Sequence, residues 1–421
     1  MRKKAVGIAL FVISSITLGT YFLFMRIDTN QAHINKIFDI ARNTRPTPLS
    51  KLKYVLQDYS AYNNITKTIQ SFLRQEIKLK VNLENIKQSN GSPQAGLSGN
   101  PLFFIQDNQN DLKMVVKVFE NPFDPTGEFI SELSGFQLAS TIKGKNFNII
   151  SAKGVGKAVI NGKTYGLIAI SPASGTNMQD LVLKIIRRKP DSPERNEALD
   201  IAKQSFERLG KALAELHQIR TEKNVSIHYT LIERAKQNLN NVIRHLCDDN
   251  HGIDTKALKQ YFEQLKNELK KVTTTRSIAH GDPHLGNFMY DEREGTIFIV
   301  DLSSFHFAAD REGNPIQNAA LDFMGILDII SVNKAFGMNE EEQAILRKAF
   351  TNSYGSTPTE IEQKFFALER QLDTLSFFLE PKKASPDKTL TKTDRITNLI
   401  LKFEIEKLKE SVNRAKASFN F

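Results

Sequence analysis

The sequence predicts an α+β chain with two lobes, a small lobe built on an antiparallel sheet and a larger helical lobe, preceded by an N-terminal membrane helix. Three observations lead to this prediction. Residues 5–25 carry no charge, residues 81–172 alternate short apolar runs with turn residues, and residues 173–421 repeat apolar positions every three or four residues. A chain of 421 residues suits one large two-lobed domain or two to three smaller ones.

Composition excludes several classes of protein. With 40% apolar and 25% charged residues the chain is globular, which rules out wholesale disorder and a fibrous repeat. The single cysteine, Cys247, rules out a disulfide-stapled scaffold and a cysteine-based zinc site. The net charge of +10 attracts phosphates, nucleic acids and anionic membranes alike. Because the sequence has no nucleic-acid-binding motif, we expect no nucleic-acid partner.

Residues 1–25 predict a membrane segment. The basic residues 2–4 precede 21 uncharged residues, 5–25, and about 20 are enough to span a bilayer as a helix. The apolar run is longer than that of a secretory signal, and only Thr17 and Gly19 offer a cleavage pair. An uncleaved anchor is therefore favoured over a cleaved signal. Basic residues flank both ends in similar numbers, so they do not fix the orientation.

Residues 26–80 predict a helical extension. Apolar residues recur at helical spacing from Leu52 to Ile69, after an early break at Pro46 and Pro48. We interpret this region as packing helices without chemistry, either a stalk or a cap on the lobe that follows.

Residues 81–172 predict the small lobe, which would bind nucleotide. Short apolar runs bounded by turn residues favour strands, and the Asn-Gly pair favours a tight type I′ hairpin. The expected elements are strands at 102–105 and 114–119, a helix at 128–140, and a hairpin over 158–170 around Asn161-Gly162.

Residues 173–421 predict the helical lobe. One helical stripe runs from Phe206 to Ile219. Two short strands interrupt the helices, one near 288–290 and one at 297–300, on either side of a polar loop.

The chemistry is concentrated between residues 280 and 301. The loop reads His280-Gly281-Asp282-Pro283-His284-Leu285-Gly286-Asn287, and Asp301 follows the strand at 297–300. Phosphoryl transfer needs an acceptor hydroxyl held in line with the phosphate and cations that neutralise the phosphate oxygens. A loop carboxylate such as Asp282 can accept the hydroxyl proton. Oxygen ligands suit Mg²⁺, so Asn287 and Asp301 are the candidate metal ligands.

Two alternatives apply to the same loop. His280 and His284, with Asp282 between them, could form a metal hydrolase site. However, Gly281 and Pro283 prevent the regular helix that would bring the two histidines onto one face. We favour histidines that orient the loop by hydrogen bonds. A purely structural loop is the second alternative.

Upstream residues predict the nucleotide-binding part of a kinase. Lys117 lies inside a strand of bulky residues, where a lysine needs a partner, and phosphate oxygens with a helix glutamate would provide it. Glu132 is preferred to Glu128 for that glutamate because it lies within the body of the helix. The alternative for Lys117 is an edge strand with its amine in water.

Two further segments complete this prediction. Gly96, Ser98 and Gly99 would let a hairpin backbone approach the phosphates, although their spacing is not the G-x-G-x-x-G pattern. Ser171 and Ala173 fall where a linker between lobes is expected, and their backbone would contact adenine.

These motifs together resemble the aminoglycoside phosphotransferase and choline kinase-like family, which has a protein-kinase-like fold. The resemblance extends from about residue 81 to 328. It is carried by segments 95–100, 103–105, 115–117, 209–217, 280–287, 299–301 and 321–322. The sequence departs from the family after the metal aspartate, where Leu302-Ser303-Ser304 replaces an aromatic residue followed by an acidic residue or glycine.

The resemblance also implies roles for individual residues. Asp282 would be the catalytic base, Asn287 and Asp301 would hold Mg²⁺, and Lys117 would pair with the phosphates of ATP. Asp322 would buttress the active-site loop.

We therefore expect an ATP- and Mg²⁺-dependent phosphotransferase that acts on a hydroxyl of a small molecule. An atypical protein kinase is one alternative, but no Asp-Phe-Gly and Ala-Pro-Glu pair bounds an activation segment. A membrane-tethered pseudokinase that serves as a scaffold is another. The joint presence of Lys117, Asp282, Asn287 and Asp301 disfavours it.

The expected use of ATP also bears on localisation. ATP is plentiful in the cytosol, so we expect residues 26–421 to face the cytosol behind a single membrane helix; the chain would be exported if residues 1–25 were a cleaved signal. The sequence does not identify the acceptor, choose between ATP and GTP, or predict an oligomeric state.

Overall fold

The computed structural model describes residues 57–58, 64–88, 100–122, 124, 127–248, 252–310, 313–379 and 392–419. The predicted membrane segment at 1–25 lies outside these residues, as do Gly96, Ser98 and Gly99. Within the described part of the chain, no helix combines the length and apolar character needed to cross a bilayer.

The chain divides into two compact units. Apart from its first residues, the first unit comprises residues 49–130 and 152–172, and the second comprises residues 131–151 and 173–421.

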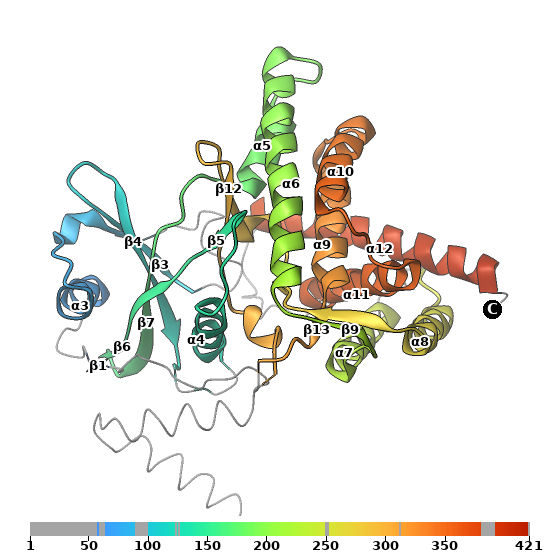
Figure 1. Ribbon diagram of the computed structural model, residues 1–421, viewed down its shortest axis with the longest axis horizontal. Coiled ribbons are helices and arrows are strands. Elements are labelled where there is room, and N and C mark those ends of the chain that lie inside the picture. The colour runs from blue at the N-terminus through green and yellow to red at the C-terminus, as the bar shows by residue number, and fades with distance from the viewer. Residues whose placement is uncertain are drawn as a thin grey trace, which may run out of the picture. The chain divides into compact units, whose positions relative to one another are not determined.

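The first unit is built on a six-stranded sheet in the order β1-β6-β7-β4-β3-β2 (Figure 1). Only β1 and β6 pair in parallel; the other neighbours are antiparallel, which confirms the predicted antiparallel sheet. The strands are β1 (Gln57–Asp58), β2 (Ile86–Gln88), β3 (Leu102–Gln106), β4 (Leu112–Glu120), β6 (Ala152–Ile160) and β7 (Lys163–Ile170).

The β6–β7 hairpin has the turn that its sequence predicts. Ile160 pairs with Lys163, and the two residues between them are Asn161 at φ 51° and Gly162 at φ 77°. Positive φ at both central residues is the requirement of a type I′ turn, which Asn and Gly meet with little strain. The predicted hairpin is therefore confirmed.

Part of the predicted helical extension packs on this sheet. Helix α3 (Ile65–Phe72) begins at Asn64, whose side chain accepts hydrogen bonds from the Thr66 and Lys67 amides, and a π-helical turn, η1 (Leu73–Ile77), continues it. Ile69, Phe72 and Leu73 are fully buried in one apolar cluster with residues of β3 and β4. Each such side chain contributes about 1.5–3 kcal/mol through burial.

The second unit is mainly helical, as predicted for the C-terminal part. Helices α6 and α10 lie along each other (Figure 1), joined by a buried ion pair between Arg195 and Glu342. Helices α7, α8, α11 and α12 share an apolar core that includes Phe262, Phe365 and Leu408. The helices are α5 (Met178–Arg187), α6 (Pro193–Ile219), α7 (Tyr229–Asp248), α8 (Thr255–Lys271), α9 (Ala319–Val332), α10 (Glu340–Tyr354), α11 (Glu360–Leu379) and α12 (Lys392–Phe419). Helix α4 (Glu128–Ala139) belongs to the first unit up to Ile130 and to the second from Ser131.

Two small sheets of the second unit position the loop that carries the chemistry. One has the order β5-β12-β11-β8 and the other β13-β10-β9. The predicted strands near 288–290 and 297–300 are confirmed as β11 and β12, although Val300 lies just beyond β12. The loop connects β10 to β11. The strands are β5 (Phe147–Ile149), β8 (Thr176–Asn177), β9 (Thr221–Val225), β10 (Thr274–Ser277), β11 (Phe288–Asp291), β12 (Thr296–Ile299) and β13 (Gln317–Asn318).

Candidate active site

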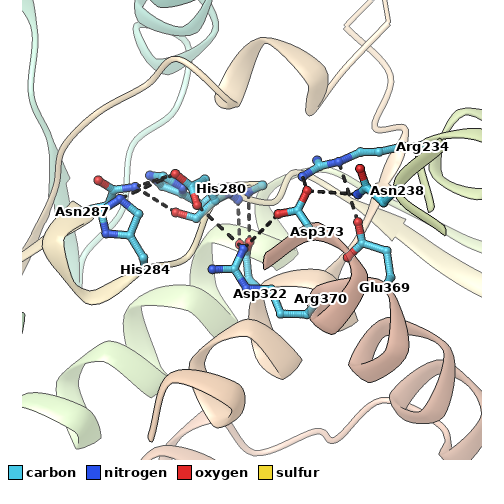
Figure 2. Close-up of polar contacts among 11 residues, drawn as sticks. Arg234, Asn238, His280, His284, Asn287, Asp322, Glu369, Arg370 and Asp373 are labelled. Atoms are coloured by element: carbon cyan, nitrogen blue, oxygen red, sulfur yellow. Dashed lines mark hydrogen bonds and ion pairs between the residues drawn. The ribbon is translucent and has the colours of Figure 1, made fainter. Parts of the chain in front are cut away.

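Asp322 anchors the start of the loop. This residue lies in the first turn of α9 and is fully buried. Its Oδ2 accepts from the His280 amide at 2.6 Å, and its Oδ1 accepts from the Gly281 amide at 2.9 Å (Figure 2). The Nε2 atom of His217 lies 2.9 Å from Oδ2. Gly281 has a φ of 85°, a left-handed conformation that glycine adopts without strain.

The environment of Asp322 keeps its carboxyl ionised. Burial alone would raise the pKa of Asp322, but hydrogen bonds from His217 and from the Gly281 amide offset burial, and the pKa lies below its usual range. The Tyr354 hydroxyl lies 2.7 Å from Nδ1 of His217. Burial raises the pKa of Tyr354, so its neutral phenol donates to Nδ1 and His217 donates from Nε2 to Asp322.

Both ring nitrogens of His280 are occupied by the backbone. Nδ1 accepts from the Asp282 amide at 3.3 Å, so Nε2 carries the proton and donates to the Val300 carbonyl at 3.2 Å. The ring is fully buried and packs against Phe288 and Phe305. Because neither nitrogen is left for a metal, the two-histidine metal hydrolase is not supported.

Asp282 presents a half-buried carboxylate with only long contacts to neighbouring side chains. Its side chain is 36% exposed. Oδ2 lies 3.3 Å from Nδ2 of Asn287 and 3.6 Å from Nε2 of His284, and Oδ1 lies 3.9 Å from Nη1 of Arg370. Strong charge-assisted hydrogen bonds are about 2.7–2.9 Å long. The carboxylate is therefore oriented from both sides yet accessible to an incoming hydroxyl.

Asn287 is fixed by the same loop. It is 3% exposed, and its Nδ2 donates to the Asp282 carbonyl at 2.8 Å. This bond sets the orientation of the amide and leaves Oδ1 as the atom able to bind a cation. The Asn287 carbonyl accepts from the Val300 amide at 2.9 Å, which places Asn287 beside the chain that leads into Asp301.

Asp301 adopts a left-handed backbone conformation at φ 55°. Aspartate is among the few residues other than glycine that adopt this conformation readily, because its short polar side chain can hydrogen-bond locally. Oδ1 of Asp301 accepts from the Ser303 hydroxyl at 2.8 Å and from its amide at 3.3 Å. An amide oxygen and a carboxylate at the same end of the β11–β12 hairpin form the all-oxygen donor set that Mg²⁺ prefers, so these residues fit that ion. In the described part of the chain, no group of three or more His, Cys, Asp or Glu side chains forms a metal site.

His284 lies against the carboxylate of Asp282. Its amide donates to the Asp282 carbonyl at 2.9 Å, and its Nε2 faces Oδ2 of Asp282 at 3.6 Å. Burial, followed by the charge of Arg370, lowers the pKa of His284 despite the attraction of Asp282. The imidazole is therefore mainly neutral near pH 7.

The predicted nucleotide-binding residues are placed only in part. Lys117 lies in β4, between β3 and β7, and is 7% exposed, with Nζ 5.3 Å from the ring centre of Phe119. The alternative of an edge-strand lysine with its amine in water is therefore wrong. Glu132 is buried in α4. Ser171 and Ala173 follow β7 without regular structure.

Several residues of this site were not predicted from the sequence. Arg370 of α11 lies 3.9 Å from Asp282 and also pairs with Asp373 of the same helix, which in turn pairs with Arg234 of α7. None of the three belongs to a recognisable motif. His217 did carry a signal, because it ends the 209–217 segment on which the resemblance partly rests.

Residues 170–307 match the sequence model of a family described as "Phosphotransferase enzyme family". This part of the chain is similar to phosphotransferases. The predicted resemblance and the predicted enzyme class, a phosphotransferase, are thereby confirmed. The matched residues include the 280–287 loop and Asp301, but neither Lys117 nor Arg370. No curated protein sequence matches the chain.

Several solved phosphotransferase structures are similar to the chain at low identity. An ethanolamine kinase of Plasmodium vivax is 14% identical, with coverage of 83% of this chain and 91% of that chain and a TM-score of 0.47. A thermostable mutant of an aminoglycoside phosphotransferase is 14% identical, with coverages of 82% and 98% and a TM-score of 0.45. A glucosamine kinase is 14% identical, with coverages of 73% and 76% and a TM-score of 0.42. These scores are too low to carry an inference about substrate.

Proposed function

We propose that this protein is an ATP- and Mg²⁺-dependent kinase that transfers the γ-phosphate of ATP to a hydroxyl of a small molecule. The observation that carries the proposal is the geometry of the 280–301 region. There, a half-exposed carboxylate, Asp282, lies 3.3 Å from the buried amide of Asn287, and Asp301 follows at the end of the same hairpin. The family match over these residues supports the same chemistry.

Each residue of the loop has a proposed role. Asp282 aligns the acceptor hydroxyl and accepts its proton. Oδ1 of Asn287 and the carboxylate of Asp301 would hold Mg²⁺, which when bound neutralises phosphate oxygens. Asp322 and His217 keep the loop in place. With this arrangement the rate enhancement comes mainly from positioning and charge neutralisation.

The nucleotide-binding roles follow the sequence interpretation. We propose that Lys117 pairs with ATP phosphates and with Glu132, that Gly96, Ser98 and Gly99 approach the phosphates, and that Ser171 and Ala173 contact adenine. Burial of Lys117 supports its role, because a buried lysine requires a polar or anionic partner.

Residues 1–25 are proposed to anchor the enzyme in a membrane, with residues 26–421 in the cytosol. The support is the uncharged run at 5–25 and the need for ATP. A C-terminal tag in intact cells should resist externally added protease and become sensitive after permeabilisation. Cleavage of the tag in intact cells would contradict this topology.

The test of the proposed function is nucleotide consumption by the purified chain. ADP release from Mg-ATP should be measured with ethanolamine, glucosamine and an aminoglycoside as acceptors, and with a generic protein substrate. We expect turnover with a small hydroxyl compound, and loss of that turnover in Asp282→Asn without loss of nucleotide binding. Absence of ATP binding, or activity that survives Asp282→Asn, would overturn the proposal. Transfer to the protein substrate alone would favour the protein kinase.

A further inference from the structure

Three charged residues from α7 and α11 meet beside the catalytic loop. Nη1 of Arg370 lies 3.3 Å from Oδ2 of Asp373 and 3.9 Å from Oδ1 of Asp282. Nη2 of Arg234 lies 3.1 Å from Oδ1 of Asp373 (Figure 2). Arg234 lies within the segment that matches the family, residues 170–307, whereas Arg370 and Asp373 lie outside it.

Arg370 is held in a largely buried environment. Its side chain is 14% exposed, and its Nε is buried without a hydrogen-bond partner among the described residues. A buried donor without a partner is unfavourable, as is a charge removed from water. This arginine therefore does more than cover a helix surface: its Nη1 lies between two carboxylates, Asp373 on its own helix and Asp282 on the loop.

Asp373 is held in place by side chains of α7. Its Oδ1 accepts from Nη2 of Arg234 and from Nδ2 of Asn238, both at 3.1 Å. Burial would raise the pKa of Asp373, but Arg234 and Arg370 offset burial and lower it, so the group stays charged. The other carboxylate near Arg234 is Glu369, at 3.7 Å, and burial raises its pKa to about 7. Near neutral pH, Asp373 is therefore ionised and serves as the anionic partner of both arginines, whereas Glu369 is partly protonated.

The contacts on Asp282 come from opposite sides. Asn287 and His284 face Oδ2, whereas Arg370 faces Oδ1. The residues of the 280–287 loop place no charged side chain next to Oδ1. Arg370, supported by Asp373, is the group that restrains rotation of the carboxylate on that side.

We propose that Arg370 is a positioning residue that orients the carboxylate of Asp282 for the acceptor hydroxyl, with Asp373 setting the place of Arg370. This inference rests on the proposed function, because it assigns Arg370 a role through the proposed base. It also gives α11, outside the matched segment, an indirect part in the reaction, through Asp282.

The test compares Arg370→Ala, Arg370→Lys and Asp373→Asn with a matched control, Arg347→Ala. Arg347 is an exposed arginine of α10 that donates to the Ser331 hydroxyl at 2.8 Å, away from the loop. The measurements are kcat and KM for Mg-ATP by ADP release, with the acceptor that the wild type turns over best or with water if none is used. Mg-ATP binding by calorimetry and the melting temperature are measured in parallel.

We expect Arg370→Ala to lower kcat by about 10- to 100-fold, as misplacement of a reacting group does, with KM and Kd for Mg-ATP within two-fold of wild type. Arg370→Lys keeps a cation on the same helix, so its kcat should fall less than that of Arg370→Ala. Millimolar methylguanidinium should restore part of kcat in Arg370→Ala and none in Asp282→Asn. Arg347→Ala should behave as wild type.

The outcomes separate the two proposals. If the wild type neither binds nor consumes ATP, the proposed function fails and this role of Arg370 falls with it. If the wild type is active and Arg370→Ala keeps its kcat, or loses only affinity for Mg-ATP, the positioning role alone is overturned. If Arg370→Ala does not fold, Arg370→Lys and Asp373→Asn decide: unchanged kcat in both overturns the proposal, and lowered kcat at unchanged Mg-ATP affinity supports it.

Discussion

The imidazole of His217 and the carboxylate of Asp322 form a buried contact of 2.9 Å that joins α6 to α9 behind the 280–287 loop. Asp322 uses the same carboxylate to accept the His280 and Gly281 amides. One buried side chain thus holds a packing contact between helices and the backbone that leads into Asp282. Stability of the second unit and alignment of the site are therefore expected to depend on the same residue.

Asp322→Asn should destabilise the protein by about 2–4 kcal/mol. The carboxylate accepts from three donors, whereas an amide has one oxygen and would turn its NH₂ group toward a donor. Denaturant unfolding monitored by circular dichroism measures the difference. Asp200→Asn, at an exposed position of α6, is the control and should change stability by less than about 0.5 kcal/mol. Equal stability of the two variants would contradict this role of Asp322.

The contribution of Asp322 should also depend on pH. Its folded-state pKa is lowered, since the hydrogen bonds from His217 and the Gly281 amide outweigh burial, so folding favours the ionised form. The resulting stability is fully present above the unfolded pKa of about 3.9 and is lost as the pH falls through the folded value. The stability difference between wild type and Asp322→Asn should therefore be large at pH 7 and shrink in strongly acidic buffer. A difference that stays constant over this range would count against the assignment.

Gly325→Ala should lower activity by moving the 280–287 loop, which carries the proposed base. A Cβ at Gly325 of α9 would lie 2.3 Å from Cγ of Pro283, a rigid ring next to Asp282. Either the loop or the helix must shift, with a loss of about 1–3 kcal/mol in stability. ADP release should fall more than stability alone explains.

Gly210→Ala provides a matched comparison for this prediction. Its Cβ would lie 2.5 Å from the Phe350 carbonyl, where α6 packs on α10. It should destabilise the fold while leaving kcat of the folded fraction near wild type. Similar kcat values for Gly210→Ala and Gly325→Ala would refute the effect on the loop.

Short sequence patterns predicted the features of this fold that are formed by residues close together in the chain. The Asn161-Gly162 turn and the β11–β12 hairpin follow from turn chemistry and from short apolar strands on either side of a polar loop. The loop from His280 to Asn287 was recognisable because its residues are close in sequence. These features need no knowledge of tertiary packing.

Contacts between distant segments were beyond such patterns. Arg370 lies on a helix whose charged residues would be expected to face water, yet it is 14% exposed and reaches Asp282. Which helix face meets the loop depends on how α7, α9 and α11 pack, and periodicity in one segment does not specify that packing. Tyr354, which contacts His217, was missed for the same reason.

Asp301→Asn should reduce turnover by about 10²-fold and raise the Mg²⁺ concentration needed for half-maximal activity. Asparagine tolerates the left-handed backbone at φ 55°, so the substitution removes the charge with little added strain. The weaker ligand should bind the cation less well, and chelation of Mg²⁺ should abolish the remaining ADP release. Asp291→Asn, at the other end of the β11–β12 hairpin, is the matched control because its side chain caps a turn that asparagine can also cap. An unchanged Mg²⁺ dependence in Asp301→Asn would remove Asp301 from the metal site, since a ligand that contributes nothing measurable to cation affinity has no such role.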